Sequence, residues 1–407
     1  VARHRFAAVG ASRPQSRLSA AALSGAQSGA GDRTGGSTTL SDTLRPVRAS
    51  TPIDAAGTLA RHALRWVAAA ANAMTLTKPV VVPFEGPLTK GNFVRRTDRF
   101  TAHLVLDGIE VHDGENGEVK AHCINPGRME AFVDPGATIW ARRAPENGPK
   151  RKTDWTWELI ERDGILCSTN TQRPNTLIAA VLREKALTGF TDYKSVKAEH
   201  VLPHEGPGVK SRCDFFVEEN DGTSHYIEVK NCHATYPDED VLRGWGYFPD
   251  SVSERAARHC RELAALASKP KTKCTVIIVA SRADATRGIR PSDYHDPGFC
   301  AAAREAQKAG VVFRGLRASH TTEATTIEDE IPVDLATPSS DILCALHRAW
   351  EACAPITGWD RTFGKDAPKR VANGPFAHNK GRAGCDSTLL PITSEHFTPT
   401  VSRHFDD

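Results

Sequence analysis

The sequence predicts a small β-barrel followed by an α/β domain. Between about residues 84 and 153, short strand-like runs are separated by turns rich in glycine and proline, a spacing typical of small barrels. From about residue 154 to residue 335, strand patterns alternate with helical apolar spacing, which is the order expected of an α/β domain. A chain of 407 residues is long enough for both domains with sequence to spare.

The barrel prediction depends on how its strands and turns alternate. Turns such as DGENG, NPG, DPG and ENGP separate runs that are alternating or β-rich in character. Trp155 and Trp157 share one strand face and are expected in the core rather than on a base-stacking surface. The strand-like runs lie at 101–108, 118–124, 137–144 and 155–164.

The second domain begins with helical apolar spacing at 175–187 and continues with a two-stranded hairpin at 213–231. Ser251, with Glu254 three residues later, has the spacing of a capping box and predicts the start of the next helix. The other expected elements are a helix at about 252–267, a strand at 275–281, a helix near 298–309 and a strand at 311–317.

Both ends of the chain are expected to lie outside the two domains. Residues 1–79 are interpreted as a disordered or targeting extension, because their first part is rich in Ala, Ser, Gly and Arg and poor in acids. The first methionine is Met74. The alternative to a targeting extension is therefore that translation starts at Met74 and that the sequence before it has been joined to it wrongly. Two compartments are possible. The protein is expected in the cytoplasm, or in an organelle if residues 1–73 are a transit peptide. Residues 336–407 show no periodicity and are expected to form an irregular tail with one short helix at 339–353.

Composition argues against a membrane-spanning protein and against a cysteine-based zinc site, and it leaves nucleic-acid binding undecided. Hydrophobic residues make up 40% of the sequence, a value ordinary for soluble globular proteins, and no apolar run reaches the roughly 18 residues of a membrane span. The ten cysteines show no C-x-x-C and no zinc-type spacing, which favours reduced thiols in an intracellular protein. The net charge of +3 does not by itself indicate a nucleic-acid partner.

The hairpin at 213–231 carries acids where folding alone does not require them. Side chains alternate along a strand, so Glu228 and Lys230 share one face of the second strand. A three-residue turn ending at Gly222 would place Asp214 opposite Glu228. Opposed residues have Cβ atoms about 4.5–5.5 Å apart, and two like charges there destabilise a sheet unless a cation lies between them.

A Mg²⁺ ion would offset this repulsion, because it takes oxygen ligands, typically one or two carboxylates plus water and phosphate. Asp214 and Glu228 are therefore the candidate metal ligands. Lys230 would hold or help deprotonate an attacking water, and Arg212, two residues before Asp214, would contact phosphate. This constellation is typical of metal-assisted phosphodiester hydrolysis.

The three-residue pattern alone is not specific. The triplets Glu118-Val119-Lys120 and Asp192-Tyr193-Lys194 repeat it elsewhere in the chain. The alternative is a solvated hairpin face on which Lys230 pairs with Asp214 or Glu218.

Several basic residues are candidates for contact with a DNA backbone. On the helix at about 252–267, an apolar stripe leaves the basic residues on the exposed side, although a merely solvated face is the alternative. The stripe consists of Val252, Ala256, Cys260, Leu263 and Ala267. The candidates are Arg95, Arg96 and Arg99 in the barrel, Arg128 after the NPG turn, and Arg255, Arg258, His259 and Arg261 on the helix.

Several stretches occur in a fixed order over roughly residues 84–318. They are PLTKGNFVRRTDRFTAHL (87–104), AHCINPGRM (121–129), Asn170-Thr171-Gln172 with Asn175, SRCDFF (211–216), YIEVKN (226–231), YFPDSVSERAARHCREL (247–263) and SRADATRGIRPSDYHDPGF (281–299). Together they resemble the sugar fermentation stimulation protein (SfsA) family. Two loops, CHATYPDEDVLRGWG and HEGPGVK, are longer than is usual in that family.

The resemblance implies an OB-type barrel followed by a restriction-endonuclease-like PD-(D/E)xK domain with a central mixed sheet, and it implies DNA binding. Matched by position, Asp214, Glu228 and Lys230 take the nuclease-core places. We therefore expect a DNA-binding protein with a Mg²⁺-dependent, nuclease-like site. The alternatives are a non-catalytic DNA-binding regulator of sugar metabolism genes with a vestigial site, and a structural adaptor. The oligomeric state and the preferred DNA stay open.

Overall fold

The computed structural model describes residues 75–110, 117–127, 129, 131–145, 151–203 and 211–353, all within one compact unit of the chain, Ala60–Asp407. Nearly all of the expected extension at 1–79, the candidate Arg128 and the tail beyond residue 353 lie outside the described residues. In the described part, no helix is both long and apolar enough to cross a membrane.

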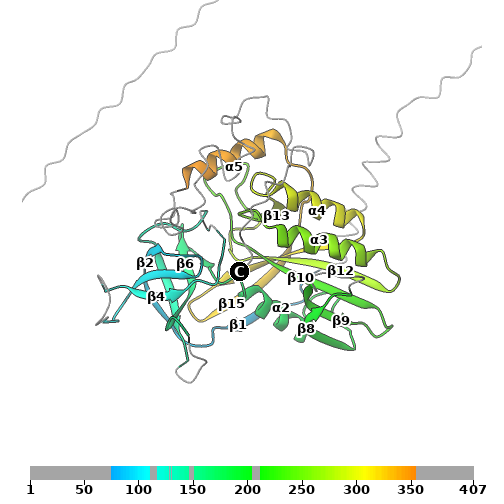
Figure 1. Ribbon diagram of the computed structural model, residues 1–407, viewed down its shortest axis with the longest axis horizontal. Helices are drawn as coiled ribbons and strands as arrows, with labels where there is room; N and C mark the ends of the chain where they lie inside the picture. Colours follow the sequence, from blue (N-terminus) through cyan, green and yellow to red (C-terminus); the bar gives the residue numbers. More distant parts are fainter. Residues whose placement is uncertain are drawn as a thin grey trace, which may run out of the picture. The chain divides into compact units, whose positions relative to one another are not determined.

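The first domain is a closed β-barrel, as the sequence predicts (Figure 1). Its sheet has the order β4-β3-β2-β5-β6-β7, and an additional pairing of β6 with β4 closes five of the strands into the barrel. The last two strands, Trp155–Arg162 and Ile165–Ser168, both begin after the expected boundary at residue 153. The strands are β2 (Leu88–Arg96), β3 (Thr101–Leu106), β4 (Val119–His122), β5 (Thr138–Arg143), β6 (Trp155–Arg162) and β7 (Ile165–Ser168).

Aromatic side chains fill the barrel interior. Phe93 stacks on Trp157 with ring centroids 5.0 Å apart, and both rings are buried. Trp155 is buried as well, so the prediction that both tryptophans belong to the core is confirmed. Leu104 and Ile139 complete this cluster from neighbouring strands.

The second domain is built on a seven-stranded mixed sheet with the order β1-β15-β14-β12-β10-β9-β8. Its centre, β10-β12-β14, is parallel, and the outer pairs are antiparallel. β1 precedes the barrel in sequence yet pairs with β15, a position that local sequence did not predict. The strands are β1 (Val80–Pro83), β8 (Ser195–Val201), β9 (Arg212–Glu218), β10 (Ser224–Cys232), β12 (Thr272–Ala280), β14 (Val312–His320) and β15 (Ala324–Ile331), with a separate parallel pair β11 (Trp245–Phe248) and β13 (Gly288–Pro291).

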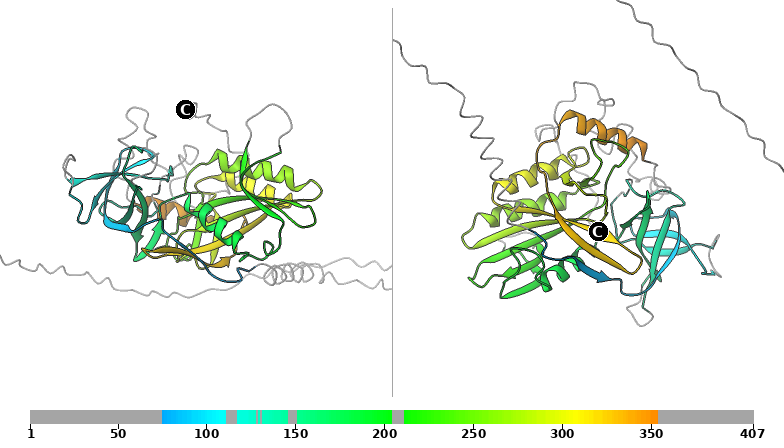
Figure 2. Two further views of the ribbon diagram at one scale, coloured as in Figure 1. Left: turned by 90° about the horizontal axis from the view of Figure 1, so that it is seen from below. Right: turned by 180° about the vertical axis from the view of Figure 1, so that it is seen from behind.

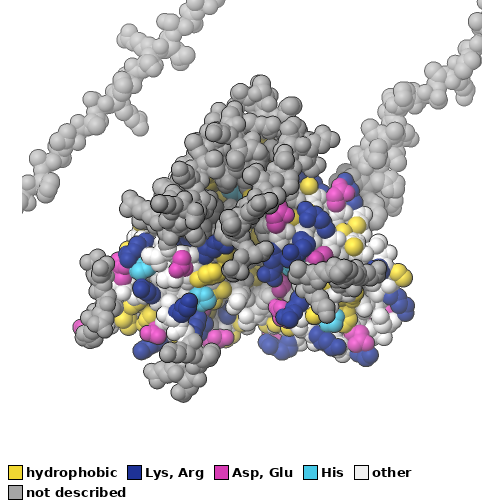
Figure 3. All heavy atoms as spheres, in the orientation of Figure 1, with side chains coloured by type: hydrophobic (Ala, Val, Ile, Leu, Met, Phe, Trp, Pro, Cys, Tyr) yellow, Lys and Arg dark blue, Asp and Glu magenta, His cyan; other side chains and the backbone are white. Residues whose placement is uncertain are grey.

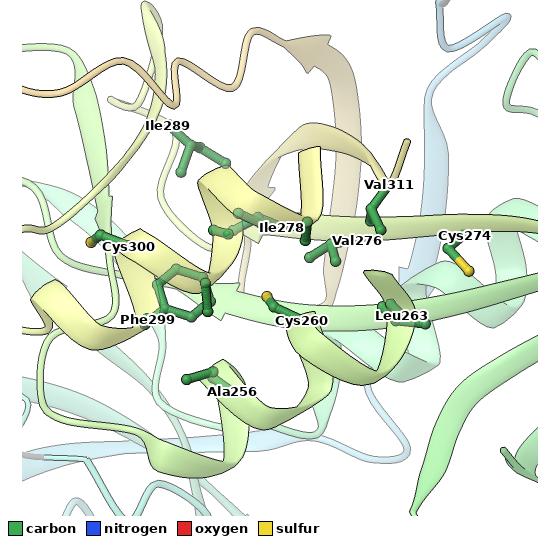
Figure 4. Packing of buried hydrophobic residues seen from close by; sticks show 14 of the residues in the cluster. Ala256, Cys260, Leu263, Cys274, Val276, Ile278, Ile289, Phe299, Cys300 and Val311 are labelled. Carbon is green, nitrogen blue, oxygen red and sulfur yellow. The ribbon is translucent and has the colours of Figure 1, made fainter. Parts of the chain in front are cut away.

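Helices cover both faces of this sheet. Helices α3 (Glu254–Ala267) and α4 (Pro297–Lys308) lie together on one side of the strands (Figure 2). Figure 4 shows Cys260 and Phe299 from these helices packed over Val276 and Ile278 of β12. Helix α2 (Arg173–Arg183) packs on the opposite face, where Leu177 and Val181 join a cluster with Ile277 and Val279.

The short helix predicted at 339–353, within the expected irregular tail, is confirmed as α5 (Ser340–Ala352). It packs against the segment CHATYPDEDVLRGWG at residues 232–246, one of the two loops expected to be long. Trp350 and Leu346 of α5 share a buried cluster with Tyr236 and Trp245 of that segment. The long loop therefore has a structural partner in the C-terminal part of the chain.

The start of α3 differs from the prediction. Its N-cap is Ser253, whose hydroxyl accepts a hydrogen bond from the Ala256 N–H at 3.3 Å, and Ser251 does not cap the helix. Val252, expected in the apolar stripe, lies before the helix and is 46% exposed. The helix begins at Glu254, two residues later than the expected start at about 252. Val252 is therefore not part of the helix face that packs on the sheet.

Candidate functional site

The hairpin of β9 and β10 positions the candidate carboxylates. Its strands pair from Glu218–Ser224 to Phe215–Ile227, which is the register predicted from the turn. Gly222 closes the turn with φ +82°, in the left-handed region that favours glycine. The pairs end at Phe215–Ile227, so Asp214 and Glu228 each lie one residue beyond the last pair of the hairpin.

Asp214 is held from two directions. Its Oδ2 accepts a hydrogen bond at 2.7 Å from the N–H of Val229, which lies two residues beyond the last residue of β10 that pairs with β9. Its Oδ1 accepts one from Nδ2 of Asn175, on the first turns of α2, at 2.8 Å. Asn175 entered the sequence argument only through the family resemblance, because nothing local indicated that α2 would reach β9.

Glu228 is almost completely enclosed, with 4% of its surface exposed. Its Oε1 accepts a hydrogen bond from Lys230 Nζ at 2.5 Å and is also hydrogen-bonded to Nδ1 of His259 on α3. Its Oε2 has no hydrogen-bond partner among the described residues. A buried, doubly engaged carboxylate contradicts the alternative of a solvated hairpin face, since Lys230 pairs with Glu228 and not with Asp214 or Glu218.

The two carboxyl groups have different electrostatics. Burial and the nearby charge of Glu228 raise the pKa of Asp214. Burial also acts to raise the pKa of Glu228, but Lys230 and His259 outweigh it and lower that pKa. Glu228 therefore loses its proton at lower pH than an ordinary glutamate, and Asp214 keeps its proton to higher pH than an ordinary aspartate.

These residues fit a hard divalent cation of the Mg²⁺ type. Both side chains offer carboxylate oxygens, and the effect of Glu228 on the pKa of Asp214 is the repulsion that a cation between them would relieve. The described residues contain no cluster of three or more His, Cys, Asp or Glu side chains able to hold a metal. Two carboxylates with water and phosphate completing the shell suit Mg²⁺, whereas zinc normally takes more protein ligands.

The structure separates the basic candidates into two groups. Arg255 and Arg258 are exposed on α3, and Figure 3 shows Lys and Arg side chains gathered over this helix. Arg212 is exposed on β9, two residues from Asp214. In the barrel, Arg99 is half-buried, and Arg95 is tied to Glu118 and His103.

Two of the basic candidates need correction. Arg96 is completely buried, and its guanidinium donates to the carbonyls of Gly127, Arg99 and Asn125, so it stabilises the barrel loops and cannot contact DNA. His259, expected on the exposed side of α3, is buried against Glu228.

The prediction that His259 is exposed was wrong for an identifiable reason. It lies three residues after Ala256 and four before Leu263, at the border of the apolar stripe. A stripe wider than about 100°, which is common for helices packed on a sheet, would have included it.

Two family models match this chain. The model described as "SfsA N-terminal OB domain" matches residues 94–169, and the model described as "Sugar fermentation stimulation protein RE domain" matches residues 172–324. They meet where the barrel ends and α2 begins.

Curated relatives and a solved structure agree with these matches. A sugar fermentation stimulation protein homolog from Methylobacterium radiotolerans is 34% identical over 256 residues, which cover 61% of this chain and 98% of the relative. One from Methylobacterium sp. (strain 4-46) is 36% identical over 258 residues, covering 61% and 97%. The structure of Pyrococcus furiosus SfsA in complex with Ca²⁺ is similar in fold, with a TM-score of 0.52, 21% identity, and coverage of 63% of this chain and 99% of that one.

Proposed function

This chain belongs to the sugar fermentation stimulation protein family, and from that premise we propose that it is a DNA-binding protein whose nuclease-like domain hydrolyses phosphodiester bonds with a divalent cation. One observation carries the proposal. Asp214 and Glu228 lie just beyond the last pair of one hairpin, close enough for the charge of Glu228 to raise the pKa of Asp214, and Lys230 is hydrogen-bonded to Glu228. The relative from Pyrococcus furiosus, in complex with Ca²⁺, supports a divalent ion in this family.

The chain's own residues take separate roles in this proposal. Asp214 and Glu228 hold the cation, Lys230 orients the attacking water, and Arg212 contacts the phosphate. When bound, Mg²⁺ would lower the pKa of a coordinated water and offset charge that develops on the phosphate. Because Glu228 is buried and ionised, it offers its charge in a site of low dielectric, where electrostatic interactions are stronger than in water.

His259 positions Glu228 in this arrangement. It approaches from α3 and engages the same oxygen, Oε1, that receives Lys230. With Oε1 occupied from both sides, the carboxylate cannot rotate freely, and Oε2 is the oxygen left for a cation. Residues that orient metal ligands in this way typically affect metal affinity or activity by about 10–100-fold.

The test is cleavage of supercoiled plasmid with Mg²⁺ or Mn²⁺. Wild-type protein is compared with Asp214→Asn and Lys230→Ala, and with Asp238→Asn and Lys308→Ala as controls at exposed positions away from the hairpin. We expect the site variants to lose activity and the controls to keep it. Equal cleavage by all five proteins would show that the activity comes from elsewhere, and absence of cleavage in all would remove the enzyme proposal.

A second candidate function is a DNA-binding regulator with a vestigial site. The hydrogen bonding of both carboxylates favours it, because Asp214 and Glu228 each have two hydrogen-bond partners within the protein in the absence of a metal. This candidate predicts DNA binding with a steep dependence on salt but no cleavage of plasmid under any metal condition.

A further inference from the structure

We propose that the barrel binds single-stranded nucleic acid on the outer face of β3 and β4, with Phe100 as a base-stacking platform. The inference deepens the proposed function and rests on its DNA-binding part alone, because it names the form of strand that the barrel takes. It requires neither the metal nor cleavage.

Phe100 is the first reason. It is 53% exposed, and the other large hydrophobic side chains exposed in the described part of the chain are all valines. Its backbone is fixed, since its N–H donates to Asp98 Oδ1 at 2.7 Å and its carbonyl accepts from the Cys123 N–H at 2.8 Å. An aromatic ring on an anchored backbone loses little conformational freedom when a base stacks on it.

The second reason is the group beside Phe100. The ring of His122 lies 6.4 Å from that of Phe100, and His122 pairs directly across from Thr101 on β3. Arg151, from the loop before β6, places Nη2 3.2 Å from His122 Nδ1 and donates to Thr156 Oγ1 at 3.1 Å. Burial and the charge of Arg151 lower the pKa of His122, so its ring is neutral at neutral pH and is a second flat surface for a base.

The strand order places Phe100, His122 and Arg151 on the surface where five-stranded OB barrels bind oligonucleotides. β3 and β4 are the second and third barrel strands, Phe100 lies in the loop between the first and second, and Arg151 lies in the loop between the fourth and fifth. In the OB fold, the face of the second and third strands and these two loops form the binding surface for oligonucleotides.

Charge on this face suits a phosphate backbone. Lys120 is exposed two residues before His122 on the same face of β4, and Arg99 and Arg151 flank Phe100 and His122. The nearby acid Glu118 is neutralised by an ion pair with Arg95. Figure 3 shows Lys or Arg side chains close to His side chains over the barrel.

Chemistry favours a single strand over a duplex. Stacking on Phe100 needs the face of an unpaired base, whereas in a duplex both faces are covered by neighbouring base pairs. Inserting a side chain into a duplex requires unstacking a base step at considerable cost. A basic surface with one exposed aromatic platform therefore matches a strand whose bases are already free.

The test measures binding of labelled oligonucleotides of about 20 nucleotides by fluorescence anisotropy, using the full chain with a chelator so that no cleavage occurs. The probes are oligo(dT), oligo(U) and a mixed-sequence duplex. We expect Phe100→Ala to weaken binding of a single strand roughly tenfold and to leave duplex binding unchanged. Phe100→Tyr should bind like wild type, and so should Val241→Ala, a control at an exposed hydrophobic position outside the barrel.

The outcomes are distinct. Loss for oligo(dT), oligo(U) or both supports the proposal and identifies the strand as DNA, RNA or either. Unchanged binding of both single strands by Phe100→Ala, or an equal loss for single strand and duplex, overturns it. Arg151→Gln provides a second measure, expected to reduce single-strand binding and its salt dependence with no change in melting temperature. Because the assay contains no metal, a failure of cleavage does not affect its result.

Discussion

The imidazole of His259 on α3 is hydrogen-bonded through Nδ1 to the carboxylate of Glu228 on β10. Both side chains are buried, at the contact between a helix and the central sheet. This contact links the candidate metal ligand to the packing of α3, whose apolar residues include Cys260 and Leu263. The geometry of the site therefore depends on a tertiary interface as well as on the hairpin.

Replacing His259 should weaken metal binding. Without the imidazole, Glu228 keeps only Lys230 to orient it, so we expect His259→Ala to bind Mn²⁺ about 10–100-fold more weakly in calorimetric titration. His259→Gln should lose less, because its amide can still donate to the carboxylate. The matched control is His225→Ala, which removes a buried histidine bonded to Glu219 and Thr275 instead. Equal metal binding by the His259 and His225 variants would contradict the positioning role.

Asp214→Asn should become more stable relative to the wild type as the pH rises, in metal-free protein. The raised pKa of Asp214 means that its carboxyl holds a proton to higher pH in the folded than in the unfolded state. Its ionisation therefore costs stability at higher pH, and this cost disappears as pH falls below the unfolded pKa of about 3.9. Asparagine has one acceptor oxygen, so the variant cannot accept hydrogen bonds from both Val229 and Asn175, and this loss lowers Tm at every pH. The measurement is therefore how the Tm difference between the variant and the wild type changes with pH.

Glu228→Gln should change stability with pH in the opposite direction to Asp214→Asn. The pKa of Glu228 is lowered by Lys230 and His259 despite burial, so its ionised form stabilises the fold above the unfolded pKa, and that contribution is lost as pH falls. Glu228→Gln should therefore lower Tm at pH 7. If the Tm difference from the wild type changes with pH in the same direction for both variants, the assigned pKa shifts are wrong.

Divalent cations should stabilise the wild type and not the ligand variants. A ligand that binds only the folded state adds about 2.7 kcal/mol at a hundred times its Kd. We expect Mg²⁺, Mn²⁺ or Ca²⁺ to raise the Tm of wild type, measured at constant ionic strength, and to leave Asp214→Asn and Glu228→Gln unchanged. Glu218→Gln, at the other end of the same strand, should respond like wild type. Stabilisation of all variants alike would indicate ion binding outside the hairpin.

Exposed arginines on α3 should determine part of the salt dependence of duplex binding. Each phosphate contact that is lost should reduce the slope of log K against log salt by about 0.9. Arg255→Gln and Arg258→Gln are the test variants, and Lys308→Gln, exposed on α4, is the control. Slopes equal to that of the control would show that this face of α3 is simply solvated.

Replacing Arg96 should lower the free energy of unfolding and should not weaken DNA binding directly. Its guanidinium donates to carbonyls of Gly127, Arg99 and Asn125, and each buried acceptor left without a donor costs about 1–3 kcal/mol. Arg96→Gln should therefore lower the free energy of unfolding by roughly 3 kcal/mol in chemical denaturation. Arg143→Gln, at an exposed position on β5, should change it little. A stable Arg96→Gln protein with weaker DNA binding would reverse this assignment.

The order of a barrel before an α/β domain was predictable, because strand and helix periodicities are local properties of the sequence. The pairing of β1 with β15 was not, since Val80 and Ile327 are far apart in the chain and no local signal joins them. The triplet Glu118-Val119-Lys120 repeats the pattern of the candidate site but lies in the barrel with Arg95 and His103 as partners. The acid expected opposite Glu228 separates the two triplets in the sequence, and the fold shows that Glu118 has different partners.

The sequence by itself determined the hairpin that carries Asp214 and Glu228, because a tight turn and a two-residue side-chain period leave one register. Tertiary structure alone decided that His259 and Asn175 reach those carboxylates and that Arg96 points inward. The physical reason is that a hairpin's pairing is fixed over a few neighbouring residues. Contacts between a helix and a sheet depend instead on how whole elements pack, which no short stretch of sequence encodes.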